Sequence, residues 1–90
     1  MEYPVFLDPK ADKELRKLEE KDVSRIKEAL RGLADNPERK GERLSGSRYY
    51  RIRVGDYRAI YEILTEEKKT IVLFIGHRSK VYDDFKKLRD

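Results

Sequence analysis

The sequence predicts an α+β domain in which a helical hairpin packs on one face of a mainly antiparallel four-stranded sheet. Residues 49–64 alternate polar and apolar side chains around a tight turn, which is typical of a β-hairpin. Residues 9–33 carry apolar side chains at helical spacing, and residues 70–76 form a continuous apolar run. The elements follow the order β-α-α-β-β-β-α, and the chain, residues 1–90, is long enough for a single domain.

The N-terminal segment predicts a short strand followed by a helix. Residues 3–7 contain a proline near their start, which favours a position at the edge of the sheet. Asp8 is a good N-cap, and Pro9 fits the first helical position, where its missing N–H is harmless. The expected apolar stripe of this helix comprises Ala11, Leu15 and Leu18, and the helix is expected to end near Glu19, Glu20 and Lys21.

A second helix is expected after a short turn. Asp22 can cap it, and the Asn36-Pro37 pair ends it. Its buried face comprises Val23, Ile26, Leu30 and Leu33. Residues 37–48 lack apolar periodicity and contain glycine, proline and serine, so we expect a loop that Leu44 anchors to the core.

The central hairpin predicts its own register. A two-residue Gly55-Asp56 loop pairs Val54 with Tyr57, and it places Arg53 opposite Arg58. One face then carries Tyr50, Ile52, Val54, Tyr57, Ala59, Tyr61 and Ile63, and the other carries Arg51, Arg53 and Arg58. Facing like charges cost roughly 0.2–1 kcal/mol, so the arginines indicate an anionic ligand, although a solvated sheet face is the alternative.

The C-terminal third predicts a buried strand and a terminal segment. Residues 70–76 should form a central strand, and residues 79–89 have apolar side chains at helical spacing, so they form either a short helix or a frayed arm. This segment can bring His77, Arg78 and Tyr82 to the rim of an arginine face that the helical hairpin leaves uncovered.

The charge distribution indicates a nucleic-acid partner. The whole chain has a net charge of +4, yet residues 39–58 alone hold seven basic and two acidic side chains. There is no cysteine and only one histidine, so we expect neither a metal site nor a cofactor. No segment is apolar enough for a membrane span or a signal peptide, so the expected location is the cytoplasm, without membrane contact.

Four strings of the chain occur in the order and spacing of a known family. They are Leu44-Ser-Gly, Tyr50-Arg-Ile-Arg-Val, Gly55-Asp-Tyr-Arg-Ala-Ile-Tyr and Ile75-Gly-His-Arg-Ser-Lys-Val-Tyr. Together with the element order they resemble the RelE/ParE superfamily, the toxins of type II toxin–antitoxin pairs, over nearly the whole chain. The Gly-His-Arg string followed by Val-Tyr looks more like the RelE branch.

The resemblance implies a toxin that is a ribosome-dependent endoribonuclease. RelE-like toxins cleave mRNA in the ribosomal A site, without a metal, by attack of the 2′-OH on the scissile phosphate. The family's site positions match Arg51, Arg53, Arg58, Arg78 and Tyr82. The alternatives are a ParE-like inhibitor of DNA gyrase and a nucleic-acid-binding member without catalytic activity.

Some relatives carry lysines where this chain has Arg51 and Arg53, and arginine is a poor proton acceptor. His77 is therefore a candidate for acid–base work, with a plain strand-end residue as the alternative. Tyr82 stacks on a base, donates a proton or packs, and Tyr49 is a further stacking candidate.

Two kinds of partner follow from the resemblance. The first is the ribosome with its mRNA, and the candidates for sequence-blind contacts to RNA are Lys10, Lys13, Lys17, Arg39, Lys40, Arg43 and Arg48. The second is a cognate, RelB-like antitoxin, acidic and partly disordered, in a heterodimer or heterotetramer.

Overall fold

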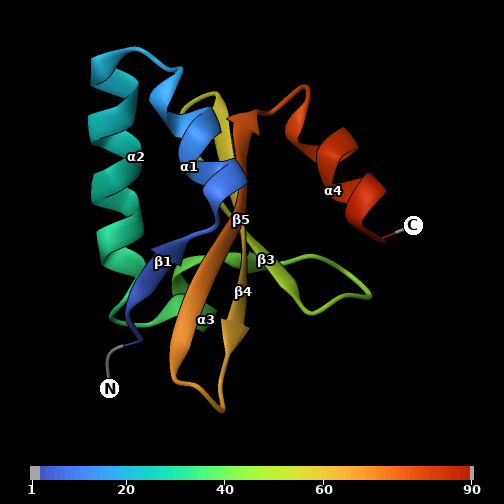
Figure 1. Cartoon of the computed structure of the whole chain (residues 1–90). Coiled ribbons are helices and arrows are strands. Elements are labelled where there is room, and N and C mark those ends of the chain that lie inside the picture. Colours follow the sequence, from blue (N-terminus) through green and yellow to red (C-terminus); the bar gives the residue numbers. More distant parts are fainter. Residues whose placement is uncertain (1–2, 90) are drawn as a thin grey trace.

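The computed structural model describes residues 3–89, with their side chains except those at positions 84, 88 and 89. Its elements are β1 (Val5–Leu7), α1 (Pro9–Arg16), α2 (Glu20–Leu33), α3 (Pro37–Lys40), β2 (Glu42–Arg43), β3 (Tyr49–Val54), β4 (Tyr57–Leu64), β5 (Lys69–His77) and α4 (Val81–Arg89). Helices α1 and α2 lie on one side of the sheet, and α4 lies on the other (Figure 1). The predicted α+β class is confirmed.

The strands form one mixed sheet in the order β1-β5-β4-β3-β2. β1 runs parallel to β5 at one edge, and the other neighbours are antiparallel, so the predicted edge and interior positions of these two strands are confirmed. The sheet has five strands rather than four, because Glu42 and Arg43 pair with Arg51 and Tyr50. A two-residue strand is too short to show alternation in sequence.

The predicted register of the β3–β4 hairpin is confirmed. Val54 pairs with Tyr57 and Arg53 with Arg58, around a turn in which Gly55 has a φ of +60°. The pairing of β4 with β5 contains a β-bulge that the sequence did not predict: Tyr61 pairs with Val72 and Ile60 with Phe74, which leaves Leu73 as an extra residue.

The helix boundaries confirm one cap and correct another. The Asp8 side chain accepts a hydrogen bond from the Lys10 amide at 3.1 Å, as predicted for the first N-cap. The predicted end of the first helix and the predicted cap of the second at Asp22 are wrong, because α1 ends at Arg16 and α2 already begins at Glu20. The segment expected to be a loop contains the short helix α3, which the Asn36 side chain caps, and strand β2.

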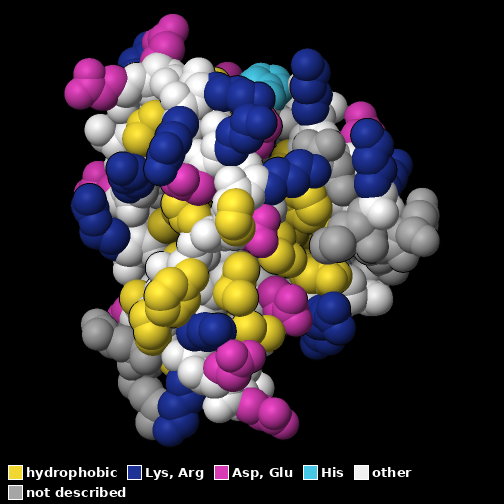
Figure 2. All heavy atoms as spheres, viewed as in Figure 1, with side chains coloured by type: hydrophobic (Ala, Val, Ile, Leu, Met, Phe, Trp, Pro, Cys, Tyr) yellow, Lys and Arg dark blue, Asp and Glu magenta, His cyan; other side chains and the backbone are white. Residues whose placement is uncertain are grey.

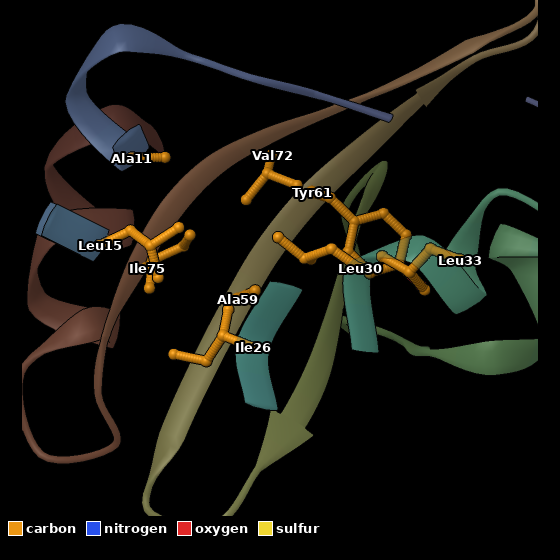
Figure 3. Packing of buried hydrophobic residues seen from close by; sticks show 9 residues of the cluster. All are labelled: Ala11, Leu15, Ile26, Leu30, Leu33, Ala59, Tyr61, Val72 and Ile75. Atoms are coloured by element: carbon orange, nitrogen blue, oxygen red, sulfur yellow. The ribbon is translucent and has the colours of Figure 1, made fainter. Parts of the chain in front are cut away.

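The main core lies between the sheet and the helices α1 and α2. Figure 3 shows apolar side chains from both helices pointing toward β4 and β5. The buried members are Ala11, Leu15, Ile26, Leu30, Leu33, Ala59, Tyr61, Val72 and Ile75. The apolar side chains of β3 pack against this cluster, so the predicted apolar face of the hairpin is confirmed.

A second, smaller core lies on the opposite face of the sheet, beneath α4. It consists of Tyr49, Ile60, Phe74, Val81 and Phe85, with Leu44 packed against it as the predicted anchor. The C-terminal segment is therefore a docked helix. The helical hairpin leaves the arginine face uncovered, as predicted, and α4 covers part of that face. None of the helices described for residues 3–89 is both long and apolar enough to cross a membrane.

Candidate functional site

A pocket of about 490 Å³ opens on the arginine face, beside α4. Its walls come from the central hairpin, from the segment after β5 and from the first turn of α4, and they comprise Arg51, Arg53, Arg58, Arg78, Ser79 and Tyr82. Lys and Arg side chains gather on the molecular surface at the end where the β3–β4 turn, β5 and α4 meet (Figure 2). The fold thus brings together five of the six predicted catalytic residues.

Arg58 is the most enclosed of these arginines, with 7% of its surface exposed. Its Nη1 donates hydrogen bonds of 2.8 Å to the carbonyl oxygens of Gly55 and Tyr57. Because these carbonyls belong to the β3–β4 turn, the guanidinium both lines the pocket and fixes the backbone conformation of the turn.

Arg51 is held by two side chains. Its Nη1 donates to the Tyr82 hydroxyl at 2.7 Å, and its Nη2 donates to Glu42 Oε1 at 2.9 Å. The hydrogen bond to Tyr82 and then the one to Glu42 raise the pKa of the Arg51 guanidinium above its usual value. Arginine only donates, so the Tyr82 oxygen is the acceptor, and the Tyr82 proton remains available to another group.

Arg53 and Arg78 are exposed at the mouth of the pocket. Within the described part of the chain, neither side chain has a hydrogen bond or ion pair to another protein group. The backbone amide of Arg78 donates to the carbonyl of Asp56 at 2.8 Å, which ties the segment after β5 to the β3–β4 turn. The two guanidinium groups are therefore positioned by the backbone and free to bind an anion.

His77 does not lie in the arginine pocket. It pairs with Tyr57, whose side chain is on the helix-covered face, and the two rings meet edge to face with centroids 5.9 Å apart. This places the imidazole beside the start of α2, in a separate hollow lined by Arg25, Asp56 and others. The expectation that His77 sits at the rim of the arginine face is wrong, since strand residues alternate between faces.

Tyr49 cannot stack on a base, contrary to expectation. Only 9% of its surface is exposed, and its ring packs edge to face on Phe85 with centroids 5.2 Å apart. Its side chain therefore belongs to the core beneath α4.

The seven predicted RNA-contact residues lie on or next to α1, α3, β2 and the segment before β3. Lys10 Nζ lies 5.0 Å from the centre of the Phe74 ring, Lys17 pairs with Glu14 at 3.2 Å, and Arg48 pairs with Glu62 at 3.2 Å. All seven are exposed: Lys10, Lys13, Lys17, Arg39, Lys40, Arg43 and Arg48.

Two residues of the site were missed in the sequence. Glu42 reaches Arg51 from strand β2, which is too short to be recognised, and Ser79 lines the pocket immediately after Arg78. The position of Ser79 in the Gly-His-Arg-Ser string was the available signal for it, whereas nothing in the sequence pointed to Glu42.

The pocket is suited to a phosphate group. Its guanidinium groups offer planar, permanently charged donors for phosphate oxygens, and two hydroxyl groups stand beside them. No group of three or more His, Asp or Glu side chains placed to hold a metal ion occurs in the described part of the chain. The positive charge that the pocket presents to a ligand therefore comes from arginine.

Solved structures of RelE toxins are similar to this chain. A mutant of the Escherichia coli toxin RelE in the free state is 25% identical, with a TM-score of 0.82 over 98% of each chain. The toxin–antitoxin complex RelBE2 from Mycobacterium tuberculosis gives 28% identity and a TM-score of 0.77 over 89% of this chain and 95% of that chain. The archaeal RelE–RelB complex from Pyrococcus horikoshii gives 29% identity and a TM-score of 0.75 over 89% of this chain and 99% of that chain.

The family comparison gives a second, independent result. Curated protein sequences contain no match to the chain. The family model described as the ParE toxin of type II toxin–antitoxin systems matches residues 5–82. The chain therefore belongs to the ParE toxin family of type II toxin–antitoxin systems, with the fold that the RelE toxins share.

Proposed function

We propose that this toxin is a ribosome-dependent endoribonuclease that cleaves mRNA in the A site. The observation that carries the proposal is the pocket itself, which is lined by four arginines and by Tyr82, whose hydroxyl accepts from Arg51 and keeps its own proton available. Phosphoryl transfer develops negative charge on the equatorial oxygens, and preorganised cations at that position stabilise the transition state.

Each residue of the pocket has a separate role in the proposed reaction. Arg53 and Arg78, at the mouth of the pocket, bind the scissile phosphate, while Arg58 stabilises its developing charge from beneath. The 2′-oxygen attacks phosphorus, the bond to the 5′-oxygen breaks, and a 2′,3′-cyclic phosphate forms. Tyr82 donates its proton to the departing 5′-oxygen, and the resulting phenolate is stabilised by Arg51, 2.7 Å away.

The exposed lysines and arginines outside the pocket bind the ribosome. They are distributed over α1, α3 and the segment before β3, which suits contacts to phosphates at many points rather than recognition of one sequence. The ribosome then supplies the mRNA in a fixed conformation, and the toxin acts in the cytoplasm.

The match to the ParE model supports a second candidate function, inhibition of DNA gyrase. In that case the toxin binds a protein, and the arginine pocket takes part in no bond cleavage. The two candidates differ in what Arg78 does: removing its side chain slows mRNA cleavage about 10²–10³-fold under the first proposal and leaves gyrase inhibition intact under the second.

One experiment separates the two functions. Purified toxin is incubated with programmed ribosomes and mRNA and, in parallel, with gyrase and relaxed plasmid. We expect mRNA cleavage with unaffected gyrase. Inhibited supercoiling with intact mRNA would establish the gyrase function, and inertness in both assays would indicate a member without catalytic activity.

The cognate antitoxin is an acidic, partly disordered, RelB-like chain, and we propose that one of its segments docks beside β1. The amides and carbonyls of Val5 and Leu7 face the free edge of β1, because Pro4 and Asp8 bond to β5 and the bonding direction alternates along a strand. An apolar groove of about 330 Å³ adjoins that edge, with Leu30 in its wall and Lys27 and Arg31 at its rim. Phe6, 51% exposed, lies on the same strand.

This arrangement suits an acidic segment that adds an extended strand to β1 and fills the groove with apolar side chains. We expect Lys27→Glu to lower the affinity for the antitoxin about tenfold, mainly through slower association, as measured by titration calorimetry and stopped flow. The matched control is Lys13→Glu on α1, away from the groove, which should leave the affinity unchanged. Light scattering of the complex distinguishes a heterodimer from a heterotetramer.

A further inference from the structure

The arginine pocket lacks a direct proton acceptor for the attacking 2′-OH. Its guanidinium groups only donate hydrogen bonds, and the Tyr82 hydroxyl already serves the leaving group in the proposed reaction. The remaining polar side chain in the wall is Ser79. Its Oγ lies 2.9 Å from Nδ1 of His77, whose ring points toward the other face of the sheet.

The direction of the Ser79–His77 hydrogen bond follows from a third group. The backbone amide of Ser79 lies 3.2 Å from the same Nδ1 atom, and a backbone N–H can only donate. Nδ1 is therefore the acceptor, and the proton of the neutral imidazole is on Nε2. The hydroxyl of Ser79, which lines the pocket, then donates to Nδ1, and its oxygen can still accept a proton.

We propose that Ser79 relays the proton of the attacking 2′-OH to His77 across the edge of the sheet. This inference rests on the proposed endoribonuclease function. As the 2′-oxygen attacks phosphorus, its proton moves to Ser79 Oγ, and the Ser79 hydroxyl proton moves to His77 Nδ1. The serine is unchanged at the end, and the imidazolium returns its proton to water after the cyclic phosphate has formed.

The position of His77 fits this role. Its hollow of about 560 Å³ carries charges of both signs on the elements around it, namely Glu19, Lys21, Asp22 and Arg25 on the α2 side and Asp56 in the β3–β4 turn. The imidazole is exposed, so it exchanges protons with solvent, whereas the guanidinium groups of the pocket remain charged on the other side of the sheet.

The relay is tested by single-turnover cleavage of ribosome-bound mRNA at saturating toxin. Ser79→Ala and His77→Gln should each slow cleavage about 100-fold, the lower end of what a positioned acid–base group contributes. The double variant should be no slower than either single variant, because both residues serve one proton transfer. Ser79→Thr keeps a hydroxyl and should retain most of the rate, and Ser24→Ala on α2 is the matched control.

Two further readouts separate the relay from a structural role. The wild-type rate should rise with pH as protonated His77 becomes rarer, and His77→Gln should lose that rise. Ribosome binding and melting temperature should be unchanged in all variants. Full-rate cleavage by Ser79→Ala, or single-variant losses that multiply in the double variant, would overturn the relay while leaving the endoribonuclease function intact. A wild-type toxin that cuts no mRNA would overturn both.

Discussion

The two faces of the sheet are built in different ways. The face under α1 and α2 buries one continuous apolar cluster to which both helices and the sheet contribute. The opposite face buries a smaller cluster under α4 and, directly beside it, presents four arginines around a pocket. One face thus supplies most of the stability, and this allows the other to keep like charges together at a cost in stability.

The four arginines of the pocket also fall into two groups, which differ in whether the protein holds their side chains by hydrogen bonds. Arg58 and Arg51 are held by hydrogen bonds to the protein, whereas Arg53 and Arg78 are exposed and without such bonds among the described residues. Arg58 is bonded to the turn at Gly55, and Arg51 is bonded to Tyr82 of α4, so both side chains contribute to the fold. Substitutions should therefore separate stability from activity even within one pocket.

The largest expected effect is on stability, and it is seen by comparing one substitution in each of the two cores. Leu15→Ala removes a fully buried side chain from the cluster under α1 and α2, and we expect a loss of about 2–5 kcal/mol in the free energy of unfolding. Phe85→Ala should instead loosen α4 locally. Hydrogen exchange should then show lost protection in α4 with β4 and β5 still protected; a loss of protection throughout the molecule would show that the two cores unfold as one.

The sequence predicted only part of the difference between the two faces of the sheet. The alternation in residues 50–63 and the Gly55-Asp56 turn predicted the hairpin register, since local patterning and turn type together specify it. That register alone brought Arg51, Arg53 and Arg58 to one face. The predicted capping of the first helix by Asp8 also held, because an N-cap interaction is local.

What the sequence did not reveal depends on tertiary pairing. Strand β2 exists because Glu42 and Arg43 pair with β3, and the β-bulge at Leu73 depends on how β5 meets β4. Arg58 was predicted on the arginine face, but its burial there depends on the positions of two backbone carbonyls. His77 was assigned to the wrong face because its place in the chain, next to Arg78, does not fix the direction of its side chain.

The second-largest expected effect distinguishes the exposed Arg78 from the hydrogen-bonded Arg58. Arg78→Ala should slow mRNA cleavage about 10²–10³-fold with a change in unfolding free energy within about 0.5 kcal/mol, because its side chain has no hydrogen bond or ion pair among the described residues. Arg58→Ala should slow cleavage comparably and also lose about 1–3 kcal/mol, because two turn carbonyls lose their donor. Equal melting temperatures for the two variants, measured by calorimetry, would contradict the division.

A smaller effect tests the helix-covered face at high pH. Tyr61 is fully buried, and burial, followed by the nearby Tyr50, raises the pKa of its hydroxyl well above the ordinary value of about 10. Its stabilising contribution is therefore complete below pH 10 and declines as pH rises further, since the unfolded chain then ionises first.

Tyr61→Phe removes this titration together with the 2.7 Å hydrogen bond to the Pro37 carbonyl. We expect the variant to be less stable by about 1 kcal/mol at pH 7 and the difference to shrink above pH 10. Urea titrations at a series of pH values measure it, and a difference that stays constant up to pH 11 would mean that the tyrosine ionises freely in the folded state.

The smallest expected effect concerns Glu42, the one carboxylate among the described side chains that bonds to an arginine of the pocket. An RNA phosphate that approaches Arg51 must compete with this carboxylate, whose side chain is largely exposed, and exposed ion pairs contribute only about 0.2–1 kcal/mol. Glu42→Gln should therefore raise the affinity for RNA about two- to fivefold, measured by fluorescence anisotropy at fixed salt, and leave the melting temperature unchanged. Glu28→Gln on the exposed side of α2 makes the same charge change away from the pocket and should shift the affinity less. If Glu42→Gln instead leaves the affinity as it was and slows cleavage, Glu42 takes part in the chemistry rather than restraining Arg51.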